Sequence, residues 1–177
     1  MSELTQARNC AILPFGDIMI KKNNACCFSG HRVIPSKLFP TVSDNLERII
    51  KKLASDGICD FITGGALGFD ALAADIIIKL RKDLPQLRLI LALPCRSQSD
   101  KWRKADKQRY DEHCRLADDV RVLSEEYDSG CMMRRNCFMV DNSCCCVFFL
   151  SRTNSGTYKT VSYAMEKGLE LYNVLSD

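Results

Sequence analysis

The sequence has few prolines, few aromatic residues and no uninterrupted apolar stretch long enough to span a membrane. Its 177 residues include 5 Pro, 9 Gly and 1 Trp, and the aromatic share is 8%. This composition excludes a collagen-like chain or a low-complexity tract. The apolar stretch at residues 11–20 contains Pro14, Gly16 and Asp17, which interrupt both a signal-peptide core and a membrane span. We therefore expect a cytoplasmic protein with no membrane partner.

An excess of one charge is also missing. Lys and Arg number 25 against 22 for Asp and Glu, which gives a net charge of +3. No long basic block is present that could follow a phosphate backbone. On these grounds we do not expect nucleic acid as a partner. The 46% hydrophobic and 27% charged residues are typical of one globular domain with its own core.

Cysteine is abundant, but the spacings that usually bind zinc are absent. The chain has 11 cysteines, and no C-x-x-C or C-x-x-H pattern occurs among them. The run Cys144–Cys146 fits the small apolar residues of a buried strand. We expect reduced, structural cysteines, no metal site and no required cofactor.

From residue 25 onwards, short apolar runs alternate with amphipathic stretches, which is typical of strand–helix units around a parallel sheet. The pattern predicts strands at 25–28, 59–63, 87–93, 119–123, 144–150 and 171–174, and helices at 40–55, 69–82, 100–117, 132–142 and 157–167. The strands are almost continuously apolar, so both faces of the sheet should be covered. We expect a single-domain α/β fold over residues 25–177, a three-layer, Rossmann-like, doubly wound and mostly parallel sheet. Residues 1–24 would form an N-terminal arm or an added edge strand.

Polar loops follow three of the predicted strands, at the sheet edge where open parallel sheets bind their ligands. The loop after 25–28 combines small residues with two groups that pair with anions. The loops after 59–63 and 144–150 contain glycine and lead directly into helices, where backbone amides and the helix dipole favour a phosphate. The candidate ligand-binding residues of these loops are Ser29, Gly30, His31, Arg32, Gly64, Gly65, Gly68, Asp70, Ser155, Gly156 and Thr157.

Two further candidates, Arg135 and Asn136, belong to the predicted helix 132–142. Adjacent helical residues point about a quarter-turn apart, so only one of Arg134 and Arg135 is expected to reach the crevice. Asp70 has two interpretations, because at a helix start it either caps the helix or contacts a ligand.

Several motifs, taken in order, resemble the YpsA-like branch of the SLOG superfamily. They are SGHR, ITGGALGFDALAAD, the block from Lys101 to Tyr110, and RRNCFMVDNSCCCVFFL followed by NSGTYKTVSYAMEKG. The superfamily also contains the DNA-processing protein A (DprA/Smf) family and the lonely-guy (LOG) phosphoribohydrolases. The resemblance spans residues 25 to 175 and implies a Rossmann-like fold with a crevice for nucleotides or nucleotide-derived ligands.

The two better-known families match this chain differently. Arg135 and Asn136 fall on the R-K pair of the lonely-guy pattern, but Thr160 falls where that family has a glutamate. Cleavage of a glycosidic bond needs a carboxylate, which threonine cannot replace. Ser155, Gly156 and Thr157 with Thr160 instead resemble the S-G-x-x-x-T of the DNA-processing family, whose members bind single-stranded DNA.

Our leading hypothesis is a binding module for a nucleotide or a nucleotide-derived phosphorylated small ligand, with a sensing or regulatory role and no clear catalytic machinery. One alternative is a phosphoribohydrolase or another N-glycosidic hydrolase that uses Asp70 as its acid or base. The other is a single-stranded nucleic-acid interaction module. A homodimer is an option, since the apolar Leu72, Ile76 and Trp102 fit either an interface or the core.

Overall fold

The computed structural model describes residues 18–176, which build a six-stranded sheet. The strands are β1 (Ala25–Gly30), β2 (Asp60–Thr63), β3 (Arg88–Leu93), β4 (Asp119–Val122), β5 (Cys145–Phe149) and β6 (Glu170–Asn173). Their order across the sheet is β4-β3-β2-β1-β5-β6, and every pairing between them is parallel. The predicted doubly wound α/β fold is confirmed, with a sheet that is parallel throughout rather than mostly so.

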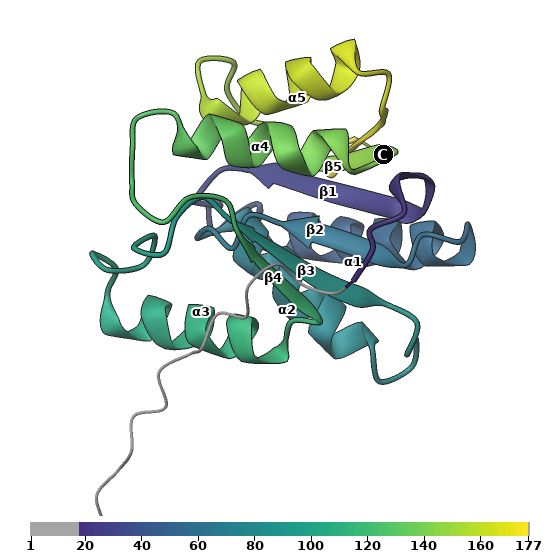
Figure 1. Cartoon of the computed structure of the whole chain (residues 1–177). Coiled ribbons are helices and arrows are strands. Elements are labelled where there is room, and N and C mark those ends of the chain that lie inside the picture. Colours follow the sequence, from purple (N-terminus) through teal and green to yellow (C-terminus); the bar gives the residue numbers. More distant parts are fainter. Residues whose placement is uncertain (1–17, 177) are drawn as a thin grey trace, which may run out of the picture.

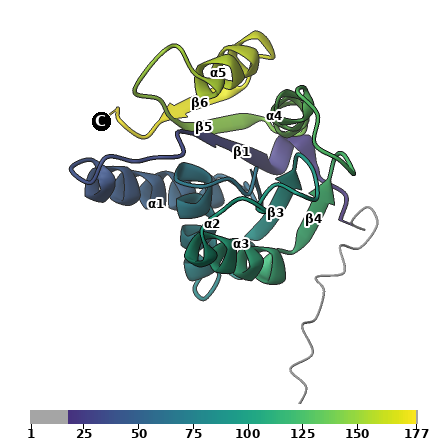
Figure 2. The same cartoon turned by 90° about the vertical axis from the view of Figure 1, so that its left-hand side faces the viewer.

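Helices cover both faces of the sheet (Figure 1). They are α1 (Phe39–Ser55), α2 (Phe69–Leu80), α3 (Lys104–Leu116), α4 (Cys131–Asp141) and α5 (Gly156–Glu166). Helices α1, α2 and α3 lie on one face, and α4 and α5 lie on the other, as the turned view in Figure 2 also shows. The three-layer prediction is therefore confirmed.

The core consists of two apolar layers on either side of the sheet. Successive strand residues alternate between them, so Cys26 and Phe28 face the layer of α1 and α2, while Ala25 and Cys27 face the layer of α4 and α5. Every cysteine from Cys26 to Cys146 is a free thiol. Among residues 18–176, no group of three or more His, Cys, Asp or Glu side chains is placed to hold a metal ion.

Most predicted boundaries lie within one or two residues of the observed ones, and two of the differences have a clear structural reason. Strand β1 continues through Ser29 and Gly30, because these residues pair with Phe148 and Phe149 at the end of β5. Helix α3 starts at Lys104 rather than near residue 100, since the chain before it forms tight turns such as the one from Ser99 to Trp102.

The expectation for residues 1–24 falls mostly on residues 1–17, which lie outside the described residues; a short 3-10 helix occupies Lys22–Asn24. Leu72 and Ile76 are buried in the core of the chain itself, whereas Trp102 is only partly buried. In the part of the chain that the structure describes, no helix is both long and apolar enough to cross a membrane.

The strand order places a topological switch point between β1 and β5. From β1 the chain moves outwards through β2 and β3 to β4, and α4 then brings it back to β5 on the other side of β1. The loops after β1 and β5 therefore leave the sheet side by side and diverge, which opens a crevice at their carboxyl ends.

Candidate functional site

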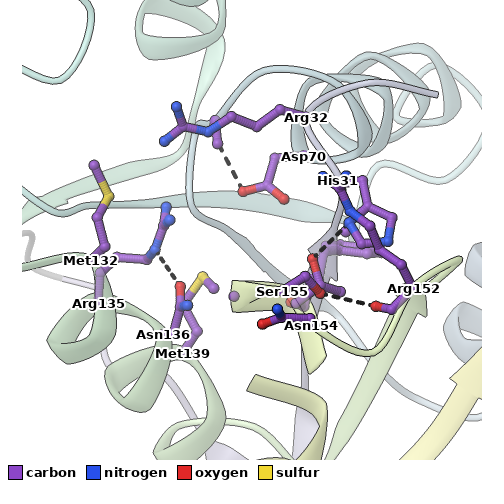
Figure 3. Close-up of a pocket in the computed structure, with 16 residues that line it drawn as sticks. His31, Arg32, Asp70, Met132, Arg135, Asn136, Met139, Arg152, Asn154 and Ser155 are labelled. Atoms are coloured by element: carbon purple, nitrogen blue, oxygen red, sulfur yellow. Dashed lines mark hydrogen bonds between the residues drawn. The ribbon is translucent and has the colours of Figure 1, made fainter. Parts of the chain in front are cut away.

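A cavity of about 330 Å³ lies at this switch point, and we call it the switch-point cavity. Its wall is formed by the end of β1 and the chain after it, the start of α2, one side of α4, and the loop from β5 into the start of α5 (Figure 3). The predicted site residues that line it are Ser29, Gly30, His31, Arg32, Asp70, Arg135, Asn136, Ser155, Gly156 and Thr157. Gly64, Gly65 and Gly68 do not line it.

The start of α5 presents backbone donors to this cavity. The first amides of a helix have no acceptor within the helix. Ser155 is the N-cap, and its Oγ accepts the amide of Tyr158 at 3.1 Å. No hydrogen bond among the described residues uses the amides of Gly156 and Thr157. Two backbone donors and the positive end of the helix dipole are therefore available to an anion.

Two arginines add positive charge to the same cavity. Arg32 follows β1 and Arg152 follows β5, and both side chains are exposed. Neither guanidinium makes a hydrogen bond or ion pair with another residue in the range 18–176. Arg152 and its neighbour Asn154 were not singled out from the sequence. Their position in a polar loop that directly follows a strand was the signal that could have identified them.

His31 joins the ends of β1 and β5 and is buried. Its Nε2 accepts the backbone amide of Ser151 at 3.0 Å, and its Nδ1 lies 3.5 Å from the hydroxyl of Thr157. An accepting Nε2 leaves the ring proton on Nδ1, so the imidazole is neutral. Burial lowers the pKa of His31, and the positive charge of Arg152 lowers it further. The positive charge at this edge therefore comes from the arginines and not from His31.

The glycine loop before α2 differs from the open phosphate loop that the sequence suggested. The Gly64 amide donates to Oδ2 of Asp70 at 3.0 Å, and the Gly65 amide donates to the hydroxyl of Thr63 at 3.0 Å. The Ala66 amide approaches the same Asp70 oxygen at 3.5 Å. These donors are satisfied within the protein, so the loop has no free amides at these positions to offer a phosphate.

The glycines of this loop instead permit close packing. A Cβ at Gly64 would lie 1.6 Å from Nη1 of Arg135. At Gly68, whose φ is +76°, a Cβ would lie 2.3 Å from the carbonyl oxygen of Arg32. Any side chain at either position would displace the protein's own atoms. Gly64 and Gly68 are thus required by close packing against Arg135 and the chain after β1.

Arg135 is almost fully buried and connects α4 to the loop before α2. Its Nη1 donates to the carbonyl oxygen of Gly64 at 2.5 Å, and its Nε donates to Oδ1 of Asn136 at 2.7 Å. Burial lowers the pKa of Arg135, while the nearby carboxylate of Asp70 opposes this shift. Burial likewise raises the pKa of Asp70, against the influence of Arg135 and of the loop amides. Arg134 points elsewhere and forms an ion pair with Asp128.

Thr160 stands where the lonely-guy pattern has its glutamate, and it is buried rather than exposed to the cavity. Its hydroxyl accepts from Nδ2 of Asn136 at 2.8 Å and donates to the carbonyl oxygen of Gly156 at 3.0 Å. Asn136 and Thr160 thereby fix the start of α5 against α4. This arrangement positions the free amides of α5, and it brings no acid or base to the cavity at that place.

Comparison with known proteins agrees with the motifs. The family model YpsA, described as the YspA SLOG family, matches residues 36–174. The SPbeta prophage-derived protein YoqJ of Bacillus subtilis is 29% identical over 136 residues, which cover 70% of this chain and 80% of that protein. The resemblance to the YpsA-like branch of the SLOG superfamily is confirmed.

Two solved structures share the fold. DNA processing protein A from Streptococcus pneumoniae gives a TM-score of 0.62 at 17% identity and covers 85% of this chain. The corresponding protein from Helicobacter pylori, described for its unique single-stranded DNA binding mode, gives a TM-score of 0.59 at 19% identity and covers 86% of this chain. The present chain spans 50% and 65% of those two proteins, respectively.

These structures correct one expectation. The small net charge and the absence of a basic block argue against nucleic acid as a partner. A protein with the same fold is described for binding single-stranded DNA, so that expectation is wrong. Net charge is a poor guide here because it does not report local charge: Arg32 and Arg152 place positive charge at the cavity although the whole chain is nearly neutral.

Proposed function

Because the chain belongs to the YspA SLOG family, we propose that it is a binding module for a nucleotide or a nucleotide-derived phosphorylated ligand. The switch-point cavity holds the phosphate. The observation that carries this proposal is the convergence of the free amides of Gly156 and Thr157 with the unpaired guanidinium groups of Arg32 and Arg152 on one cavity. Two backbone donors with two forked cations suit the oxygens of a phosphate.

The ligand class includes both free nucleotides and nucleotides within a strand, since both present anionic phosphate oxygens. The single-stranded DNA described for the Helicobacter pylori protein supports including strands in this ligand class. A cavity of about 330 Å³ has room for a phosphate with its sugar.

We further propose that binding occurs without hydrolysis of the ligand. The hydrolase alternative depends on Asp70, the carboxylate that lines the cavity. One of its oxygens already accepts the Gly64 amide, and Thr160 replaces the carboxylate of the lonely-guy pattern. Asp70 is therefore better explained as the anchor of the glycine loop. A nucleoside monophosphate incubated with the protein should be recovered intact, whereas release of its base, abolished by Asp70→Asn, would support the hydrolase.

The test of binding uses Gly156, because a Cβ added there meets no heavy atom within 4 Å. Gly156→Asp places a carboxylate beside the free amides, and Gly156→Ala is the matched neutral control. Calorimetric titration with nucleoside mono-, di- and triphosphates should show binding to the wild type and to Gly156→Ala. Gly156→Asp should weaken it roughly tenfold or more through like-charge repulsion. Equal affinity of the two variants would place the phosphate elsewhere.

A further inference from the structure

A second cavity of about 470 Å³ lies next to the first, and we call it the Trp102 cavity. Arg32 and Ala66 line both cavities, so the two adjoin across the Arg32 side chain. Gly65 and Gly68 of the α2 loop form part of its wall, and the opposite part comes from the start of α3 and the turn before it. These two glycines, absent from the switch-point cavity, thus belong to its neighbour.

An aromatic pair forms one wall of this cavity. The rings of Trp102 and Tyr110 meet edge to face with their centroids 5.3 Å apart. Tyr110 is buried in the main core, and the partly buried Trp102 packs against that core. The indole is therefore held in a defined place while part of it is accessible, which is the property of a platform on which a base stacks.

Positive charge surrounds this wall. Arg32, Lys101 and Arg103 all line the cavity, and within residues 18–176 their side chains make no hydrogen bond or ion pair. Arg109 is different, because its guanidinium is paired with Asp75. The one acidic residue among the lining residues described is Asp106. An aromatic platform with unpaired cations around it suits a base that carries phosphate.

We propose that the Trp102 cavity binds a second base, joined by a phosphodiester to the nucleotide in the switch-point cavity. Arg32, the residue that the two cavities share, lies between the first phosphate and the linking phosphate and contacts both, and the second base stacks on Trp102. This inference rests on the proposed function, since it takes the first phosphate to be bound at the start of α5. The ligand class is thereby a pair of linked nucleotides, whether a free dinucleotide or part of a single strand.

Trp102 is the single tryptophan of the chain and lines this cavity, so tryptophan emission comes from this place alone. The experiment compares deoxyadenosine 5′-monophosphate, the 5′-phosphorylated deoxyadenosine dinucleotide and an oligodeoxyadenylate strand. Affinity is measured by calorimetry and tryptophan emission is followed in parallel. Trp102→Leu removes the stacking ring, and Trp102→Phe keeps an aromatic ring in case the first variant folds poorly.

The dinucleotide should bind wild type roughly tenfold or more tightly than the mononucleotide, which is the gain expected from stacking one base. It should quench the emission of Trp102, and the mononucleotide should not. Trp102→Leu should lose this gain but keep the mononucleotide affinity, and Trp102→Phe should retain most of it. A strand that binds more tightly than the dinucleotide identifies nucleic acid as the source, and equal affinity identifies a dinucleotide.

Two outcomes would overturn the inference while leaving the proposed function intact. One is equal affinity for mononucleotide and dinucleotide with unchanged emission, which would mean that no base enters the Trp102 cavity. The other is quenching by the mononucleotide itself, which would put the first base there. Absence of binding by all the nucleotides would overturn the proposed function together with the inference.

Discussion

Asp70 and Arg135 bind the two backbone polar groups of the same residue, Gly64. Oδ2 of Asp70 accepts the Gly64 amide at 3.0 Å, and Nη1 of Arg135 donates to the Gly64 carbonyl oxygen at 2.5 Å. The buried carboxylate and the buried guanidinium thus fix the loop between β2 and α2 from both ends of one residue. This holds the loop against α4.

Gly64→Ala should be strongly destabilising, because its Cβ would lie 1.6 Å from Nη1 of Arg135. The guanidinium of Arg135 must then move away, and its buried hydrogen bond to the Gly64 carbonyl oxygen is lost. We expect a loss of about 2–4 kcal/mol in the free energy of unfolding, measured with urea. Gly156→Ala is the control and should change that free energy by less than about 0.5 kcal/mol. Similar free energies of unfolding for the two variants would show that Arg135 moves aside for a Cβ at position 64 at little cost.

Arg135→Lys should also destabilise the fold. Lysine keeps the charge, but one ammonium cannot replace the fork that reaches both Gly64 and Asn136. We expect a loss of about 1–3 kcal/mol in the free energy of unfolding. Arg134→Lys is the matched control, since Arg134 is exposed and pairs with Asp128, and its urea midpoint should equal that of wild type. If the two lysine variants unfold at the same urea concentration, the hydrogen bonds of Arg135 to Gly64 and Asn136 do not stabilise the fold.

His31 should make stability depend on pH in the mildly acidic range. The pKa of His31 is lowered from its ordinary value of 6.5, so the unfolded chain takes up a proton there before the folded protein does. The contribution of neutral His31 is present above pH 6.5 and is lost as the pH falls through the lowered value. Protonation also removes the acceptor that Nε2 offers to Ser151.

The measurement is a series of urea unfolding curves from neutral pH down to pH 5, for wild type and for His31→Gln. Glutamine does not titrate, so the variant should be less stable at neutral pH and should show a smaller loss of stability on acidification. If the free energy of unfolding falls equally with pH in both proteins, the pH dependence belongs to groups other than His31.

The sequence predicts the layers of this fold well and the chemistry of its loops less well. Apolar strands such as CCCVFFL must be covered on both faces, and this condition determines the α/β class and brings the loops after β1, β2 and β5 to one edge. The order of the strands does not follow from such local patterns. The switch point between β1 and β5, and with it the position of the main cavity, therefore became visible only in the structure.

The glycine loops show the same limit. GGALG and NSGT look alike in sequence, since each leads from a strand into a helix. In the structure the amides of Gly64 and Gly65 in the first loop donate to Asp70 and Thr63. In the second loop Ser155 accepts only the Tyr158 amide, so the amides of Gly156 and Thr157 stay free. Which loop can hold a phosphate depends on these tertiary hydrogen bonds, and spacing alone does not reveal them.

The most direct test of the central claim is a titration of the ¹⁵N-labelled protein with a nucleoside phosphate, followed through its backbone amide resonances. If the phosphate binds at the start of α5, the amides of Gly156 and Thr157 should show the largest shift changes. The amides of Gly64 and Gly65, already bonded within the protein, should change little. The opposite pattern, with large changes at Gly64 and Gly65 and none at Gly156 and Thr157, would contradict the account.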